Sequence, residues 1–184
     1  GVQAGGKTAS IQWAEPVALF GSDPRDVQEI VAMEKAVEAN FNKEFLHDPD
    51  APLEYYVESP DVSFVDILAP GQYYGKDVRN WFNFIGPQFV GELGLKNMRV
   101  FAKNDVGFVY MNQTYEGKLD DGRDFFWRMR QTDVVQKIDG KWKILHTHLS
   151  FAANPVAKDP ATWEVDLEMP PRPLPWERAK QMQQ

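Results

Sequence analysis

The chain of 184 residues contains no cysteine and only three histidines, and both shortages limit its chemistry. Without cysteine it forms no disulfide and offers no thiolate nucleophile or thiolate zinc ligand. No apolar run reaches the roughly 18 residues of a membrane span, so no span is expected. The net charge of -7 argues against a phosphate-binding surface, so nucleic acid is not expected as a partner.

The motifs of several common enzyme classes are also missing. There is no Gly-rich phosphate loop, no Gly-x-Ser-x-Gly elbow and no His-Glu-x-x-His helix, and no cofactor is expected. The first residues, Gly1 to Ser10, lack the basic region and apolar core of a signal peptide. The compartment therefore stays open between the cytoplasm and export with a leader removed.

The composition favours a single domain, because 43% hydrophobic and 13% aromatic residues suffice for one sizeable core. Residues 1–22 are expected to form an arm on the domain surface, and residues 23–151 the domain. Residues 152–184 are proline-rich and predict an extended tail, in part polyproline-like, with Trp163 and Trp176 as anchors.

The first element of the domain is a predicted helix of about 23 residues that starts at Ser22-Asp23-Pro24, an oxygen-bearing cap followed by proline. Glu34 and Glu38 fall within its apolar stripe, and for each we expect a marginal position from which the carboxylate reaches water; the alternative is that it points into a polar cavity. The stripe consists of Val27, Ile30, Val31, Val37, Phe41 and Phe45.

Two shorter helices and a strand are predicted next. Leu53 to Val57 reads as a helix, and the strand Val62 to Asp66 places Val62, Phe64 and Asp66 on one face. A third helix opens at Gly75-Lys76-Asp77 and ends at Gly86-Pro87.

The second half of the domain is rich in β-branched and aromatic residues and predicts an antiparallel meander of four strands. Three helices followed by strands indicate an α+β domain, with the helices on one side of a strongly bent, mostly antiparallel sheet. The predicted strands are Met98 to Lys103, Val106 to Glu116, Phe125 to Ile138, and Trp142 to Ser150.

The last two strands are joined by Asp139-Gly140, a strong hairpin signal. Strict alternation places two histidines on the pocket-facing side of the final strand, although satisfied core histidines remain an alternative. That side would hold Trp142, Ile144, His146, His148 and Ser150, and the outer side Lys141, Lys143, Leu145, Thr147 and Leu149.

Three sequence stretches carry a family resemblance: Phe64-Val65-Asp66, Gly75-Lys76-Asp77-Val78, and the hairpin from Asp139 to His146. With the order of elements, they resemble the nuclear transport factor 2-like superfamily, in its SnoaL-like and ketosteroid-isomerase-like branch. The final strand is also similar to the association domain of calcium/calmodulin-dependent kinase. The resemblance covers Asp23 to Phe151 and implies a cone-shaped fold, but it is poorly specific for function.

The resemblance also implies roles for single residues. Asp66 stands where the isomerases have their general base, and Asp133 where they have a second carboxyl group, which ketosteroid isomerase keeps protonated in an apolar site. Asn42 stands where the family has an oxyanion-hole tyrosine, and this departure argues against steroid isomerisation as such.

A pocket built this way would combine Asp66 as base with Asp133 or His146 as donor or acid, while His148 orients a neighbour. The structural alternatives are that Asp66 caps the following turn and that Asp133 pairs with Arg128, Arg130 or a histidine. His146, His148 and Asp133 could together ligate a metal, but no metal is expected. The predicted aromatic wall consists of Tyr56, Phe82, Tyr115 and Trp127.

The sequence thus predicts a small-molecule-binding protein, as an acid–base isomerase, cyclase or dehydratase acting on an apolar carbonyl or polycyclic compound. The alternative is a non-catalytic ligand-binding or dimeric assembly domain. In both cases a homodimer is expected through the outer sheet face with Leu145, Thr147 and Leu149.

Overall fold

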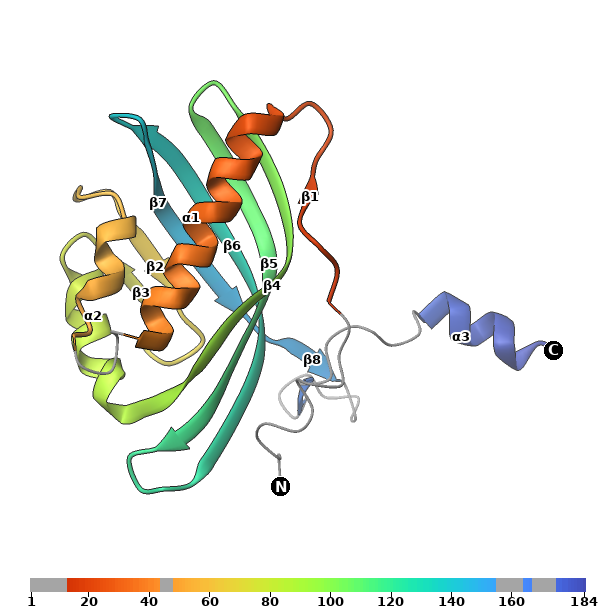
Figure 1. Ribbon diagram of the computed structural model, residues 1–184. Helices are drawn as coiled ribbons and strands as arrows, with labels where there is room; N and C mark the ends of the chain where they lie inside the picture. The colour runs from red at the N-terminus through yellow and green to blue at the C-terminus, as the bar shows by residue number, and fades with distance from the viewer. Residues whose placement is uncertain (1–12, 44–47, 155–163, 167–174) are drawn as a thin grey trace.

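The computed structural model describes residues 13–43, 48–154, 164–166 and 175–184. Its centre is a curved seven-stranded sheet in the order β1-β4-β5-β6-β7-β2-β3 (Figure 1). The strands are β1 (Val17–Ala18), β2 (Ser63–Val65), β3 (Gln72–Tyr74), β4 (Phe89–Lys103), β5 (Val106–Leu119), β6 (Asp124–Ile138) and β7 (Lys141–Ser150).

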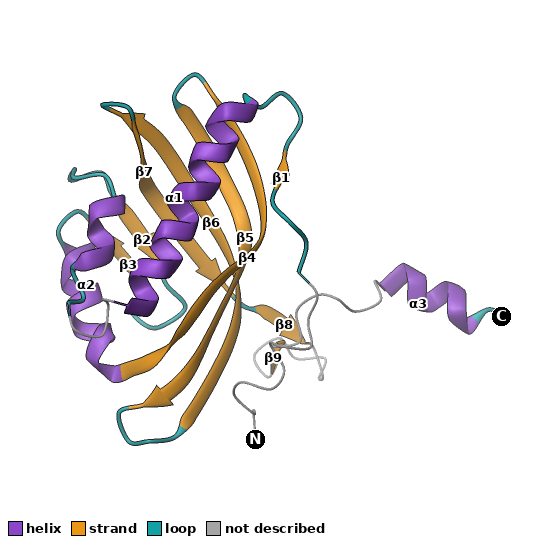
Figure 2. Ribbon diagram, viewed as in Figure 1, coloured by secondary structure: helices purple, strands orange, loops and turns teal. Residues whose placement is uncertain are grey.

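The helices of the domain lie on one side of this sheet (Figure 2). They are α1 (Pro24–Lys43), α2 (Asp77–Ile85) and two 3-10 turns, η2 (Ala51–Tyr55) and η3 (Gly86–Gln88). The pairings β1·β4 and β2·β7 are parallel and the other pairings of this sheet are antiparallel, so the predicted α+β fold with a mostly antiparallel sheet is confirmed. None of the described helices is long and apolar enough to cross a membrane.

Helix α1 begins where the sequence predicts, and Asp23 is its cap. Its Oδ1 accepts hydrogen bonds from the backbone N–H groups of Arg25 and Asp26, at 2.9 and 3.3 Å. The predicted position of Phe45 lies outside the described residues. The predicted marginal position of Glu34 is wrong, because this side chain is completely buried against the sheet.

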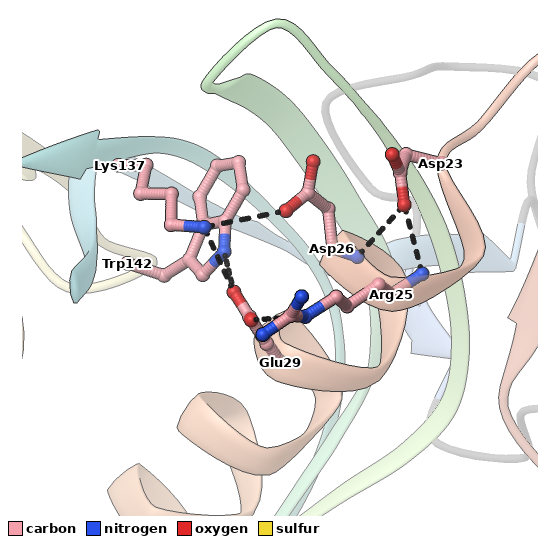
Figure 3. A network of polar contacts seen from close by, with 6 residues as sticks. All are labelled: Asp23, Arg25, Asp26, Glu29, Lys137 and Trp142. Atoms are coloured by element: carbon pink, nitrogen blue, oxygen red, sulfur yellow. Dashed lines mark hydrogen bonds and ion pairs between the residues drawn. The ribbon is translucent and has the colours of Figure 1, made fainter. Parts of the chain in front are cut away.

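The first turn of α1 is tied to the β6–β7 hairpin by a polar network (Figure 3). Glu29 Oε2 accepts from Trp142 Nε1 at 3.0 Å and pairs with Lys137 Nζ at 3.2 Å. Lys137 also reaches Asp26 at 3.6 Å, and Arg25 pairs with Glu29 across one helical turn. These contacts hold the start of the helix against the β6–β7 hairpin.

Strand β4 starts at Phe89, well before the predicted Met98. Gly91 and Gly94 weaken the strand pattern there, yet Gly91 sits opposite Gly117 of β5, and a Cβ at Gly117 would lie 1.9 Å from the Val90 carbonyl oxygen. Only glycine allows that approach of the two backbones.

The C-terminal segment differs from the extended tail predicted for it. Residues Pro175–Met182 form helix α3, and Ala152–Asn154 (β8) pairs with Glu164–Asp166 (β9) in a separate two-stranded sheet. Proline is tolerated in a first helical turn, and good helix formers follow it. Trp163 lies outside the described residues, and Trp176 is 62% exposed on α3, which stands apart from the domain (Figure 1).

Candidate functional site

A cavity of about 80 Å³ lies between the helices and the curved sheet. Its wall is largely apolar and includes all four aromatic side chains predicted for it: Tyr56, Phe82, Tyr115 and Trp127. Phe82 packs edge-on against Tyr56, with ring centroids 5.8 Å apart. The polar side chains in the wall include Asp66, Gln113 and Gln131.

Asp66 lies in the cavity wall, as predicted, at the end of β2. Trp81 Nε1 donates to its Oδ2 and the backbone N–H of Ile67 to its Oδ1, both at 2.6 Å. Burial raises the pKa of Asp66, while the hydrogen bonds from Trp81, Ile67 and Leu68 act in the opposite direction. The carboxyl group therefore anchors the turn after β2 and lies in the cavity wall.

Asp133 lies behind the cavity wall rather than in it, which corrects its predicted place in the pocket. The side chain is completely buried, and its Oδ1 accepts from Thr147 Oγ1 at 2.7 Å. Gln131 Nε2 donates to both carboxyl oxygens, at 3.1 and 3.2 Å. No ion pair joins Asp133 to arginine in the described parts of the chain, so the predicted pairing with Arg128 or Arg130 is not observed.

Glu34 of α1 is the partner of Asp133 and is missing from the predicted site. Burial is the largest cause that raises the pKa of Glu34 well above its ordinary value, and the neighbouring Asp133 adds to it. Burial also raises the pKa of Asp133, although the hydrogen bonds to that carboxyl group oppose this effect. The position of Glu34 within an apolar stripe was the sequence signal for this pair.

The two histidines predicted for the pocket lie on the opposite face of the sheet. A β-bulge leaves Leu145 without a partner, because Val134 pairs with His146 and Val135 with Ile144. One extra residue reverses the alternation, so Thr147 and Leu149 point inward, where Leu149 lines the cavity.

On the outer face, His146 Nδ1 lies 2.7 Å from Ser63 Oγ, and the His146 and His148 rings are 6.1 Å apart. Burial and the nearby His148 lower the pKa of His146, while Asp133 raises it. Within the described ranges, no group of three or more His, Asp or Glu side chains is placed to hold a metal ion.

Asn42 also lies outside the cavity wall. Its amide nitrogen donates to the Leu93 carbonyl at 2.9 Å and its oxygen accepts from the Leu93 N–H at 2.7 Å. One turn earlier, Glu38 accepts from the Leu95 N–H at 2.6 Å. Strand β1 pairs with β4 only at Arg99 and Val100, so these α1 side chains cover part of the remaining β4 edge. The predicted ligand contact of Asn42 is therefore wrong.

Residues 46–154 match the model of the SnoaL-like domain. No curated protein matches the chain. Among solved structures, an NTF2-like protein of unknown function from Pseudomonas putida superposes with a TM-score of 0.66 at 18% identity, covering 82% of this chain and 100% of that one.

Two further structures are similar. An NTF2-like superfamily protein from Salmonella enterica has a TM-score of 0.60 at 21% identity, covering 72% of this chain and 95% of its own. The association domain of C. elegans CaMKII has a TM-score of 0.54 at 16% identity, covering 68% and 95%. The chain belongs to the SnoaL-like family and has the NTF2-like fold, as the sequence predicts.

Proposed function

We propose that this member of the SnoaL-like family binds a small ring compound that carries a carbonyl group, and that Asp66 removes a proton next to that carbonyl. The observation that carries the proposal is the Asp66 carboxyl group in an apolar cavity wall, where burial raises its pKa toward the range useful for a base. The reaction class is a cofactor-independent isomerisation or dehydration.

Gln113 supplies the donor that such a reaction needs. Its side chain is 8% exposed and lies in the cavity wall. The amide N–H groups can donate to the carbonyl oxygen as negative charge develops there. Gln113 thus takes the polarising role that the sequence analysis assigned to Asp133, His146 and Asn42.

The cavity volume restricts the substrate. A cavity of about 80 Å³ has room for a few water molecules at roughly 10–15 Å³ each, well below the roughly 300–1,000 Å³ of drug-sized sites. A single ring fits this space better than a polycyclic compound. We therefore narrow the expected substrate class to small cyclic carbonyl compounds.

The test is exchange of the α-protons of cyclohexanone in D₂O, followed by NMR. The wild-type protein should accelerate exchange, and Asp66→Asn should lose at least about a hundredfold of that rate while keeping its circular dichroism spectrum. Asp61→Asn is the control, since Asp61 is exposed and lies outside the cavity wall. Equal exchange by Asp66→Asn and wild type would rule out Asp66 as the base.

A non-catalytic binding protein is the second candidate, favoured by the hydrogen bonds that already occupy both Asp66 oxygens. Cyclohexanone that shifts the indole N–H resonance of Trp81 without any accelerated exchange would support this candidate. Trp81 lies in the cavity wall and donates to Asp66, so its resonance reports on ligand in the cavity.

We also propose a homodimer through the outer face of the sheet, but with other residues in the interface than the sequence analysis named. Thr147 and Leu149 point inward, but Phe108 and Tyr110 of β5 are 36% and 39% exposed there. Phe108 stacks on both Phe101 and Tyr110, and across the sheet it is in register with Val134 and His146. A row of exposed rings on a sheet face is typical of an interface.

Sedimentation equilibrium tests this interface. The wild-type protein should be a dimer and Phe108→Asp a monomer. Phe84→Asp, which changes a 62% exposed ring on α2, should leave the dimer intact. A wild-type protein that stays monomeric at high concentration contradicts the proposal.

A further inference from the structure

Two hydrogen-bonded paths connect the cavity wall to the buried carboxyl pair Glu34–Asp133. In the first, the Tyr56 hydroxyl lies 3.3 Å from Thr147 Oγ1, which donates to Asp133. In the second, Gln131 Nε2 donates to Asp133 directly. Tyr56 and Gln131 both line the cavity, while Glu34, Asp133 and Thr147 lie behind its wall and are at most 1% exposed.

Burial raises the pKa of Glu34 well above its ordinary value, which favours a single proton on the carboxyl pair, carried by Glu34. Two charged carboxylates without a cation would be prohibitively costly in such a dry site, and no Lys, Arg or His forms an ion pair with either one among the residues described. Asp133 accepts from Thr147 and Gln131, which favours its ionised form. Neither Glu34 oxygen has a hydrogen-bond partner unless this proton lies between the two carboxyl groups.

An ionised Asp133 dictates the direction of both paths. Thr147 has one hydroxyl hydrogen and gives it to Asp133, so it can only accept from Tyr56. The hydrogen of Tyr56 is thereby directed away from the cavity, and its remaining lone pair is left for a ligand.

Gln131 is held in one orientation by the same charge. Its amide nitrogen must face the carboxylate, because the flipped amide would set its oxygen against the two Asp133 oxygens. Its Oε1 is consequently left buried without a hydrogen-bond partner in the described structure, on a side chain that is 7% exposed and lines the cavity. An unpaired buried oxygen is costly, and a ligand donor would remove that cost.

We propose that the Glu34–Asp133 pair makes this wall of the cavity an acceptor of hydrogen bonds, and that the ligand bears a hydroxyl or N–H group that donates to Tyr56 Oη and Gln131 Oε1. The inference rests on the proposed binding function and refines its substrate class to a small hydroxylated or aminated ring. Thr147 is a positioning residue, because it acts through Tyr56.

The test compares two probes of nearly equal size, phenol, which donates a hydrogen bond, and toluene, which cannot. Dissociation constants are measured from the indole N–H resonance of Trp81, and the ratio of the toluene constant to the phenol constant gives the preference. Tyr56→Phe and Gln131→Leu should each lower this ratio about tenfold, the value of one hydrogen bond. Tyr115→Phe is the matched control, because its hydroxyl lies in the same wall but donates to the Phe89 carbonyl.

Thr147→Val separates positioning from simple contact. It keeps the Tyr56 hydroxyl but removes its acceptor, so Tyr56 becomes free to donate to a ligand. The phenol preference should fall, and binding of benzaldehyde, which only accepts hydrogen bonds, should strengthen relative to toluene. If Thr147 only packs against its neighbours, Thr147→Val should weaken the binding of all three probes to the same extent.

The inference is overturned if the probes bind but the phenol preference is unchanged in both Tyr56→Phe and Gln131→Leu. It is also overturned if phenol binds wild type no more tightly than toluene. These outcomes leave the proposed binding function standing, whereas failure of cyclohexanone and all three probes to bind wild type would overturn both. If one of Tyr56→Phe and Gln131→Leu fails to fold, the phenol preference of the other variant decides between these outcomes.

Discussion

Two of the three glutamates of helix α1, Glu29 and Glu34, have opposite environments although they lie little more than one turn apart. Glu29 is partly exposed and contacts Lys137, Trp142 and Arg25 (Figure 3). The hydrogen bond to Lys137 is the largest cause that lowers the pKa of Glu29. Glu34 is buried beside another carboxyl group, and burial raises its pKa well above the ordinary value.

The contrast shows how position decides the role of one residue type. Glu29 stays charged because it contacts both Lys137 and water. It connects the helix to the hairpin, and such a partly exposed ion pair contributes little to the free energy of unfolding. Burial raises the pKa of Glu34 and so favours its protonated form, and burying a polar group is costly. Because burial of the Glu34 carboxyl group destabilises the fold, its presence behind the cavity wall is better explained by a function in the cavity than by a contribution to stability.

Asp133→Ala should have the largest effect on stability, because it removes the carboxyl group that lies beside the buried Glu34. Glu34, Thr147 and Gln131 would lose their shared acceptor, and a small cavity would form. We expect the free energy of unfolding to fall by about 3 kcal/mol. Urea denaturation followed by circular dichroism measures it, and a loss below about 1 kcal/mol would show that the network is not an intact hydrogen-bonded unit.

The pH dependence of stability should reveal Glu34 next. A carboxyl group whose pKa is higher in the folded than in the unfolded protein binds its proton more tightly when folded, so stability falls as pH rises above the ordinary value of 4.5. The contribution is at most about 1.4 kcal/mol per pH unit and ends at the folded pKa. Glu34→Gln should flatten this decline between pH 5 and 7.

Asp66 and Asp133 contribute in the same direction, since burial raises the pKa of both, so some decline should remain in Glu34→Gln. Glu38→Gln is the control, because Glu38 accepts from the backbone at the edge of β4. A slope that is identical in wild type and Glu34→Gln would contradict a shared proton at this pair.

The cap of α1 should matter less. Asp23→Ala removes the acceptor for two backbone N–H groups and should lower the free energy of unfolding by about 1 kcal/mol, whereas Asp23→Asn should recover most of it. Thermal unfolding of the two variants gives the comparison. Equal losses in both would mean that charge at the helix start, rather than the hydrogen bonds, is what matters.

The smallest effect should follow Lys137→Met on the exposed side. Because the pKa of Glu29 is lowered, its pairing stabilises the fold above the ordinary pKa of 4.5 and is lost as pH falls through the lowered value. The loss of stability should be small, disappear at 1 M salt, and be absent in Lys35→Met, which changes an exposed residue of the same helix. A loss that persists in salt would indicate packing of Lys137 on Trp142 instead.

Much of the fold could be predicted because its signals are local. Asp23-Pro24 marks the start of α1, Gly86-Pro87 the end of α2, and Asp139-Gly140 the hairpin, where both residues have positive φ, 50° and 77°. The early start of β4 was missed because its glycines are selected by contact with β5, which is not a local property.

The site was predicted only in part. Asp66 and the aromatic wall follow from the strand alternation and the family resemblance, and the structure places them around one cavity. His146, His148 and Asn42 were misplaced, and Glu34, Gln113 and Gln131 were missed. These errors involve partners distant in sequence. The bulge against β6 misplaces the two histidines, the free edge of β4 binds Asn42, and Glu34 lies beside a carboxyl group of another element.

The amino-acid sequence by itself determined the class of fold, its hairpin, the base candidate Asp66 and the absence of thiol chemistry, since these depend on composition and on neighbours along the chain. Only the tertiary structure decided which face of β7 lines the cavity and that Glu34 is buried beside Asp133. The physical reason is that one unpaired residue, Leu145, reverses every side chain after it, and that burial beside Asp133 sets the charge of Glu34.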